Sequence, residues 1–293
     1  MKIRIGIGAS VTTAEEVRSL GQAILLTGFD SIWLPEVLGQ PAIDPAVGLS
    51  YLAGVHPALK LGTTMLFTGV NPVALAKRLA SLDQVSGGRL LVTAVPGLTT
   101  GSEPSAIGLS PKVGGPVIED ALEVMRALWR GETIHHEGPA GSFQGVSISP
   151  LPVQDPLEVW LAGMAERSLL RCGRVGDGWL PTMCSPTQVA KGREVIEASA
   201  AASLRVISDE HFGVSIGYLP SGYPEGFADR VAHRLQGEEL TEVIPSRYED
   251  IAPLLERFVA VGFSKFVLRP LLPVLDWDEE LQTLGEAVLH VQR

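Results

Sequence analysis

The chain has 293 residues, of which 45% are hydrophobic and 19% charged, and its formal net charge is −10. This composition is too apolar for a disordered chain. The acidic excess argues against nucleic-acid binding, which depends largely on Lys and Arg. The two cysteines, Cys172 and Cys184, are too few for a disulfide scaffold and lack the spacing of metal ligands. We expect both to be small buried apolar residues.

The N-terminal segment has the pattern of a strand rather than of a targeting signal. Ile3, Ile5 and Ile7 alternate with other residues, and the segment lacks the apolar core and the cleavage site of a signal peptide. No apolar stretch of the sequence approaches the roughly 18 residues that a membrane span requires. We therefore expect a cytoplasmic protein without a membrane segment.

Short apolar runs alternate with helical patterns along the chain. Strands are predicted at residues 3–7, 31–34, 59–66, 89–94, 159–161, 178–180, 212–216 and 263–268. Helices are predicted near residues 13–27, 45–55, 72–85, 117–130, 166–175, 186–202, 227–234, 248–261 and 278–291. The chain after Gly97 is expected to be irregular. Residues 131–156, rich in Gly, Pro and His, are expected to form an insertion with a surface hairpin after the fourth long helix.

The order of these elements predicts the fold class. Eight strand-then-helix units imply parallel strands, and eight such units close into a (β/α)8 barrel. The alternative is an open doubly wound sheet, whose dinucleotide-binding version needs three glycines after the first strand. Here Gly6 and Gly8 are followed by Ala9, Ser10 and Val11, so the third glycine is missing. No long linker interrupts the chain, and we expect a single domain over residues 1–293.

Barrel active sites lie at the carboxyl ends of the strands. The predicted strand ends carry only two carboxylates, Glu36 and Glu166, and none of the six histidines. These observations argue against a metal site and against a Ser-His-Asp hydrolase. A mouth of small, apolar and hydroxyl side chains suits a flat cofactor ring that carries the chemistry itself. Arg269, at the end of the last strand, either binds an anionic group or pairs with a carboxylate.

Other conspicuous residues have a structural interpretation. Asp30 and Asp177 each precede a strand, at the end of the barrel opposite the active site, so capping or ion pairing is expected there. Trp33, Trp160 and Trp179 lie within predicted strands and are expected to pack in the core or the barrel wall.

Six segments in register resemble the luciferase-like monooxygenase superfamily, and within it the oxidoreductases that depend on the deazaflavin coenzyme F420. They are residues 28–36 (GFDSIWLPE), 61–65 (LGTTM), 71–77 (NPVALAK), 82–90 (LDQVSGGRL), 176–179 (GDGW) and 265–270 (KFVLRP). Together they span nearly the whole chain in the order found in the family. The resemblance implies a barrel with an insertion at about residues 131–156.

The resemblance also implies a cofactor site. The redox ring would rest on a bulge at the end of the third strand, made by a non-proline cis peptide between Thr64 and Met65. Glu36, at the end of the second strand, and Gly97, after the fourth, would lie near the ring. The loop after the fifth strand would hold the cofactor phosphate, through Gly163, Met164, Ala165 and Arg167, because free N–H groups at a helix start suit an anion.

Three departures from the family pattern leave the catalytic residue unidentified. Val37 stands where many deazaflavin enzymes have His. Leu98 stands where some sugar-phosphate dehydrogenases of the family have a catalytic Glu. The sequence 93–96 (TAVP) replaces most of the glycines that usually let the ring approach the fourth strand, and its last residue lacks an N–H donor.

The resemblance implies an oxidoreductase that transfers a hydride between F420 and a small organic substrate. One alternative is an FMN-dependent monooxygenase, for which the 131–156 insertion could supply a lid over a water-shielded pocket. Another is a barrel that has lost its chemistry and only binds a ligand or partner. The family further implies a homodimer that pairs through the helices near residues 44–58 and 72–86.

Overall fold

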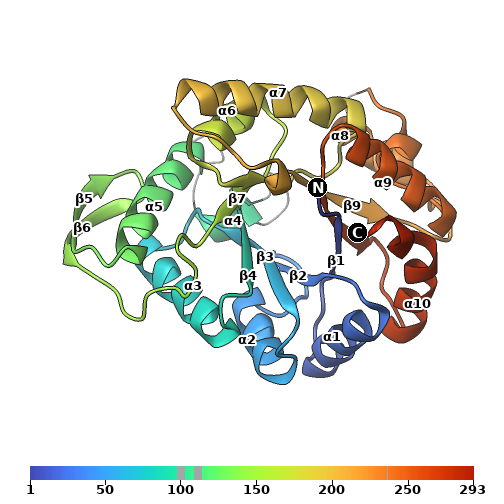
Figure 1. The fold of residues 1–293 in the computed structure, drawn as a ribbon, viewed down its shortest axis with the longest axis horizontal. Helices are drawn as coiled ribbons and strands as arrows, with labels where there is room; N and C mark the ends of the chain where they lie inside the picture. The colour runs from blue at the N-terminus through green and yellow to red at the C-terminus, as the bar shows by residue number, and fades with distance from the viewer. Residues whose placement is uncertain (98–102, 109–113, 236) are drawn as a thin grey trace. The chain divides into compact units, whose positions relative to one another are not determined.

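The computed structural model describes residues 1–97, 103–108, 114–235 and 237–293. Eight parallel strands alternate with helices, and the predicted (β/α)8 barrel is confirmed (Figure 1). The strands are β1 (Arg4–Gly8), β2 (Ser31–Pro35), β3 (Lys60–Leu66), β4 (Leu90–Val95), β7 (Val159–Leu161), β8 (Gly178–Trp179), β9 (Gly213–Tyr218) and β10 (Lys265–Pro270). Their order in the sheet is β8-β7-β4-β3-β2-β1-β10-β9.

The helices follow the predicted pattern closely. They are α1 (Ala14–Thr27), α2 (Pro45–Val55), α3 (Pro72–Ser86), α4 (Glu103–Ile107), α5 (Gly114–Trp129), α6 (Glu166–Val175), α7 (Pro186–Ala202), α8 (Phe227–Leu235), α9 (Ile251–Ala260) and α10 (Trp277–Val288). The short helix α4 lies where irregular chain was expected, so that part of the prediction was wrong. The chain packs as two compact units, and the single-domain assignment stays a prediction. Unit 1 is Met1–Ala9, Ser19–Trp33 and Trp160–Arg293, and unit 2 is Ser10–Arg18 and Leu34–Val159.

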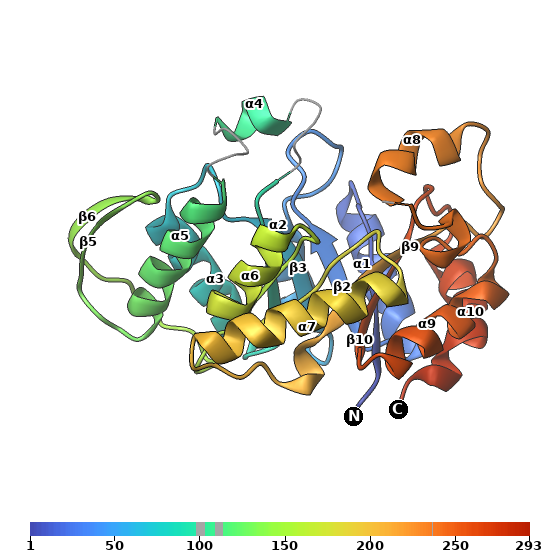
Figure 2. The ribbon, with the colours of Figure 1, turned by 90° about the horizontal axis from the view of Figure 1, so that it is seen from above.

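Unit 1 contains the pairing of β1 with β10 and of β10 with β9. The strands are in parallel register, with Arg4 opposite Lys265 and Lys265 opposite Gly213. The two chain ends meet at this sheet, where Ile3 and Arg293 exchange backbone hydrogen bonds (Figure 2). Fully buried aromatic side chains fill the core of this unit, among them Trp179, Phe212, Phe258, Phe263 and Phe266.

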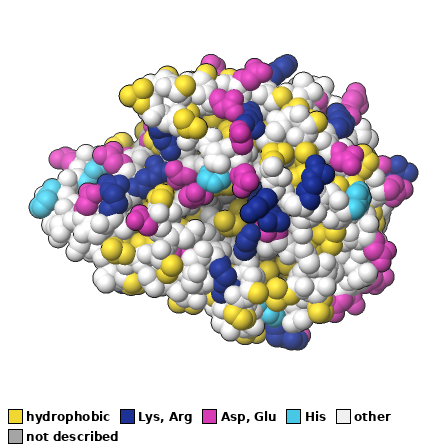
Figure 3. All heavy atoms as spheres, in the orientation of Figure 1, with side chains coloured by type: hydrophobic (Ala, Val, Ile, Leu, Met, Phe, Trp, Pro, Cys, Tyr) yellow, Lys and Arg dark blue, Asp and Glu magenta, His cyan; other side chains and the backbone are white. Residues whose placement is uncertain are grey.

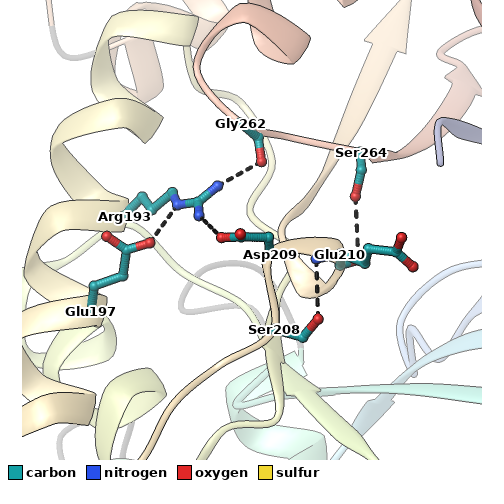
Figure 4. A network of polar contacts seen from close by, with 7 residues as sticks. All are labelled: Arg193, Glu197, Ser208, Asp209, Glu210, Gly262 and Ser264. Atoms are coloured by element: carbon teal, nitrogen blue, oxygen red, sulfur yellow. Dashed lines mark hydrogen bonds and ion pairs between the residues drawn. The ribbon is translucent and has the colours of Figure 1, made fainter. Parts of the chain in front are cut away.

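An arginine in α7 ties that helix to two loops of unit 1. Arg193 donates to the carboxylate of Glu197, 2.6 Å away, and to the backbone oxygen of Gly262 at 2.7 Å. It also donates to Asp209 in the 3-10 turn Asp209–His211, and its guanidinium lies 4.3 Å above the centre of the Phe212 ring (Figure 4). These contacts fix the chain that leads into β9 and β10.

Unit 2 contains β3, β4 and the hairpin of β5 (Ile134–Gly138) and β6 (Gly141–Val146), which lies beside α5 in Figures 1 and 2. The predicted surface hairpin within the insertion is therefore confirmed. Helix α3 begins and ends as the sequence indicates. The Asn71 side chain accepts hydrogen bonds from the N–H groups of Val73 and Ala74, Pro72 occupies the first turn, and Gly87 ends the helix at φ +64°.

One fully buried and one half-buried carboxylate fasten the insertion to the helices of unit 2. Asp83, fully buried in α3, accepts hydrogen bonds from the N–H groups of Val153 and Gln154 at 2.7 and 2.9 Å. Asp120 in α5 accepts from the N–H of Ala140 at 2.7 Å and pairs with His136 at 3.0 Å. The insertion is thus held both at its tip and where it returns to the barrel. Among the described residues, no helix is long and apolar enough to cross a membrane.

Candidate functional site

Two threonines, Thr64 and Thr93, lie side by side toward the carboxyl ends of β3 and β4 in unit 2. Thr64 lies opposite Thr93 in the parallel register, so both side chains point to the same face of the sheet. Thr64 is half-buried, whereas Thr93 is fully buried. The Thr93 Oγ1 has no hydrogen-bond partner within the described part of the chain. A buried hydroxyl without a partner destabilises a fold by about 1–3 kcal/mol, so it calls for an explanation, of which a role in a binding site is one.

The predicted bulge between Thr64 and Met65 is absent. The cis peptide bonds of the described residues are Ser149–Pro150 and Asp155–Pro156, both before proline, so the prediction of a cis Thr64–Met65 bond was wrong. Strand β3 stays in register with β4 as far as Leu66. The extended backbone of β3 is retained because its polar groups pair with β4 on one side and with the end of β2 on the other. The Thr64 carbonyl accepts from the N–H of Glu36 at 2.8 Å.

Glu36 helps to hold this strand end in place. One carboxylate oxygen accepts a hydrogen bond from the Leu66 N–H at 2.7 Å, and the side chain is half-buried. A carboxylate that accepts from a backbone N–H is fixed in orientation. Glu36 and Thr64, two of the predicted cofactor-binding residues, are therefore in direct contact. Glu36 holds the end of β3 by hydrogen bonds to the backbone of Thr64 and Leu66.

The other two predicted residues of unit 2 are placed differently. Met65 is fully buried and points away from the face that carries Thr64, because successive side chains of a strand alternate. A ligand on the Thr64 face would meet only the backbone of Met65. Gly97 is half-buried after β4 and has φ +86°, a conformation that favours glycine. Leu98 lies outside the described residues.

The predicted phosphate loop of unit 1 leads from β7 into α6. Gly163 has φ +104°, and a Cβ at this position would lie 3.1 Å from Ser168. Its carbonyl accepts a hydrogen bond from the Trp179 ring nitrogen at 3.0 Å. Only glycine suits this turn, because both its φ and its space are restricted.

The helix that follows is open to an anion at its start. Ala165 occupies the N-cap position of α6 and offers no side-chain hydrogen bond to the first turn. Uncapped N–H groups at a helix start attract negative charge. Met164 is half-buried, while Ala165 and Arg167 are exposed. Gly163, Met164 and Ala165 lie in the loop, and Arg167 lies in the first turn of α6. Their role in phosphate binding stays a prediction.

The contacts of Arg269 bear on the two interpretations that the sequence left open, which are binding of an anionic group and pairing with a carboxylate. Its Nε donates to the Ser215 hydroxyl at 2.9 Å, and one terminal nitrogen lies 3.3 Å from the Thr182 hydroxyl. Neither partner is charged, and Arg269 forms no ion pair with a carboxylate among the described residues. Burial lowers the pKa of its guanidinium. Position alone could not have predicted that its partners are neutral.

The structural interpretations of the other residues are confirmed. Asp30 pairs with Lys265 at 2.7 Å, and Asp177 pairs with Arg205 at 3.2 Å. Trp33, Trp160 and Trp179 are buried, and so are both cysteines. Burial raises the pKa of the Cys172 thiol to about 12. Sequence reasoning missed the hydroxyl of Thr93, because nothing in a strand pattern shows that a threonine lacks a partner.

Charge on the surface is mixed. On the face drawn in Figure 3, Lys and Arg side chains are interspersed with Asp and Glu side chains. A continuous cationic surface, which a phosphate backbone requires, is not seen on that face. No group of three or more His, Cys, Asp or Glu side chains within the described ranges is arranged to hold a metal ion.

The profile of the luciferase-like monooxygenase family matches residues 1–233, and the chain belongs to this family. Among curated relatives, a phthiodiolone/phenolphthiodiolone dimycocerosates ketoreductase of Mycobacterium sp. (strain JLS) is 25% identical over 232 residues, which cover 68% of this chain and 60% of the relative. An uncharacterized protein of Mycobacterium tuberculosis (strain ATCC 25618 / H37Rv) is 33% identical over 152 residues, 51% of this chain and 53% of that protein. The chain thus spans between half and two thirds of these relatives.

Several solved structures share the fold over essentially the whole chain. An F420-dependent secondary alcohol dehydrogenase has a TM-score of 0.83 at 16% identity, with 100% of both chains covered. The F420-dependent tetrahydromethanopterin reductase from Methanopyrus kandleri has a TM-score of 0.81 at 14% identity, again over 100% of both chains. A monooxygenase from Streptomyces bottropensis has a TM-score of 0.77 at 20% identity over 99% of both chains. At these identities the likeness shows the fold.

Proposed function

We propose that the protein is an oxidoreductase that transfers a hydride between coenzyme F420 and a small organic substrate. Membership of the luciferase-like monooxygenase family supports an oxidoreductase. The choice of F420 is supported by the F420-dependent enzymes with the same fold. The ketoreductase among the relatives supports hydride transfer to or from a carbonyl compound. FMN is the alternative cofactor, since a riboflavin lyase with modified FMN shares the fold as well, with a TM-score of 0.79.

The observation that carries the proposal is the unpaired hydroxyl of Thr93 beside the half-buried Thr64. A deazaflavin ring has carbonyl and nitrogen groups on its edge. Because the Thr93 hydroxyl is fully buried, these groups would accept the hydrogen bond that it lacks only after the side chains that cover it shift. The residues present therefore fit a polar, planar ring at the carboxyl ends of β3 and β4. Thr64 and Thr93 would orient it, and Glu36 would keep the β3 end rigid through the Leu66 N–H.

The loop from Gly163 to Arg167 is the proposed contact for the cofactor phosphate. The uncapped first turn of α6 supplies N–H donors, and Arg167 supplies a positive charge on the surface. When bound, the cofactor supplies the hydride chemistry, which the protein's own side chains do not provide. The residues of this chain bind and orient the reactants.

Titration with F420 and with FMN tests the proposal. Quenching of F420 fluorescence should report saturable binding, and Thr93→Val should weaken it by about 5- to 30-fold, the effect of one lost hydrogen bond to a buried partner. Thr283→Val, a change at an exposed position of α10, is the matched control and should leave the affinity unchanged.

Three results would decide between the candidates. F420 binding with hydride transfer to or from a ketone or an alcohol supports the proposal. Binding of FMN but not F420, together with oxygen consumption in the presence of a flavin reductase, favours the monooxygenase. If neither cofactor binds at about millimolar concentration, a weak affinity for any ligand, the barrel only binds some other ligand or partner.

A further inference from the structure

Arg269 is held at the carboxyl end of β10 by neutral groups of unit 1. Its Nε donates to Ser215 in β9, and a terminal nitrogen contacts Thr182, which follows β8. Its stem lies against the end of β1. A Cβ at Gly8 would come within 2.6 Å of the Arg269 Cγ and 2.9 Å of its Cδ. The missing side chain at residue 8 therefore makes room for the arginine, so its place across these strand ends is built into the sequence.

This guanidinium lacks a counter-charge. No described carboxylate pairs with Arg269, and the positive charge of Arg234 in α8 acts on it in addition to its burial, so that both lower its pKa. Taking a charge out of water without a partner is unfavourable, and a second cation nearby adds repulsion. An anion bound to the Arg269 guanidinium would supply the missing counter-charge and offset the repulsion from Arg234.

An apolar cluster in the same unit positions the polar residues. The buried side chains of Leu219, Leu235, Val243 and Ile244 form this cluster, with Met183 and Leu271 packed against it. Leu235 directly follows Arg234, Met183 directly follows Thr182, and Leu271 is two residues beyond Arg269. Thr182, Arg234 and Arg269 are thus each within two residues of an anchored apolar residue, and this holds their backbone in place.

The free hydrogens of the Arg269 guanidinium suit an oxyanion. Of its five N–H donors, the two contacts to hydroxyl groups use two, which leaves both hydrogens of one terminal nitrogen and one hydrogen of the other. Adjacent N–H groups of this kind bind two oxygens of one anion. The hydroxyls of Ser215 and Thr182 accept from the arginine, and their own hydrogens remain available as further donors.

We propose that Arg269, with Ser215 and Thr182, forms a subsite for an oxyanion group of a small-molecule ligand: a carboxylate, sulfonate or phosphate. The positive charge of Arg234 adds to the attraction for this anion. This subsite deepens the proposed function, on which it rests only for the chemistry of the ligand, because it predicts that the organic substrate is itself an acid or ester anion. Its anion binding is independent of any redox cofactor.

Binding of inorganic phosphate and sulfate tests the subsite directly. Calorimetric titration at constant ionic strength, adjusted with chloride, should show saturable binding to the wild-type protein. Arg269→Gln should weaken it by at least tenfold and Arg234→Gln by a smaller factor. Arg269→Lys keeps the charge but loses the paired N–H donors of the guanidinium, so its anion affinity should lie between those of the wild type and Arg269→Gln. If Arg269→Gln does not fold, the comparison of wild type with Arg269→Lys decides the test. Arg78→Gln, at an exposed arginine of α3, changes the net charge equally and should have no effect.

Cofactor titrations distinguish the two sources of the anion. If the substrate supplies it, F420 binds equally to wild type and Arg269→Gln, and phosphate binds together with F420. If the cofactor tail supplies it, F420 displaces phosphate, and Arg269→Gln weakens F420 but not the deazaflavin chromophore without its phosphate. Absence of saturable phosphate and sulfate binding, or equal binding by wild type and Arg269→Gln, overturns the subsite. Phosphate binding without F420 or FMN binding leaves the subsite standing and removes the proposed function.

Discussion

Thr93 and Thr63 are two buried threonines whose hydroxyls differ in hydrogen bonding. Both side chains are fully buried, but the Thr63 hydroxyl donates to the Leu34 carbonyl at 2.9 Å, whereas the Thr93 Oγ1 has no partner among the described residues. The same threonine-to-valine change should therefore have opposite effects at the two positions. The difference follows from what each hydroxyl contacts, since the two residues are of one type and both lie in strands.

We expect Thr93→Val to raise the free energy of unfolding of the ligand-free protein by about 1 kcal/mol, because a methyl group replaces a buried polar atom without a partner. Thr63→Val should lower it by about 1–2 kcal/mol, because it removes the buried hydrogen bond from the Thr63 hydroxyl to the Leu34 carbonyl. Urea denaturation of the three proteins measures both changes. Equal destabilisation by the two substitutions would show that Thr93 is paired in the folded protein.

For single residues, the sequence predicted the structural role correctly where that role follows from the position of the residue before or within a strand. Asp30 and Asp177 precede strands and form ion pairs there, as expected. The geometry of the Thr64–Met65 bond depends instead on what the neighbouring chain offers. The Glu36 N–H and the β4 ladder pair the backbone of β3 in its extended form, and neither contact can be read from the local sequence.

Among the elements, α2 has an apolar face that the rest of unit 2 does not cover. Val47, Tyr51 and Val55 follow one another at intervals of four residues, and 66%, 40% and 43% of their surfaces are exposed. Residues four apart share one side of a helix. The expectation of a homodimer through the helices near 44–58 and 72–86 stays a prediction, and this face is where it can be tested.

We expect the wild-type protein to sediment as a dimer and the double variant Val47→Glu/Val55→Glu to sediment as a monomer, because burying two unpaired carboxylates in an interface is unfavourable. Leu204→Glu, at a residue that is 98% exposed and lies outside α2 and α3, is the control and should remain dimeric. Analytical ultracentrifugation gives the masses. A monomeric wild type, or a dimeric double variant, would contradict pairing through α2.

Element boundaries were predicted best where capping residues determine them. Helix α7 begins at Pro186 because Ser185 and Gln188 form a reciprocal capping box, and it matches the predicted range. The predicted helix at 248–261 divides into the 3-10 turn Tyr248–Asp250 and α9. The five-residue helix α4 was missed because a Ser- and Pro-containing stretch of that length has no helical periodicity.

For the molecule as a whole, the buried cysteine thiols and a buried tyrosine hydroxyl predict a loss of stability at alkaline pH. Burial raises the pKa of Cys172 to about 12 and raises the pKa of Cys184 as well. Burial also raises the pKa of Tyr218, and so, to a smaller extent, does Glu280, which accepts its hydroxyl hydrogen bond at 2.6 Å. In the unfolded chain, thiols titrate near pH 8.5 and phenols near pH 10.

Above about pH 8.5 the unfolded state therefore binds fewer protons than the folded state, and the free energy of unfolding falls as the pH rises. Each fully buried group adds a slope of up to about 1.4 kcal/mol per pH unit. Denaturant unfolding between pH 7 and pH 11, with a reductant present, measures this slope. Cys172→Ala/Cys184→Ala should reduce it between pH 9 and pH 10, because both thiols are removed. Equal slopes in the wild type and this double variant would contradict the assignment.

The attachment of the 131–156 insertion affects the choice between the candidate functions. Asp83 binds its returning end and Asp120 binds its tip, so moving the insertion would break hydrogen bonds to the fully buried carboxylate of Asp83 and the half-buried carboxylate of Asp120. A cover that must swing aside at every turnover would instead come from a segment with few such anchors. Shielding a reactive oxygen intermediate from bulk solvent would then fall to the loops that leave the strand ends. In hydrogen-exchange experiments the amides of Val153 and Gln154 should be among the slowest of the insertion.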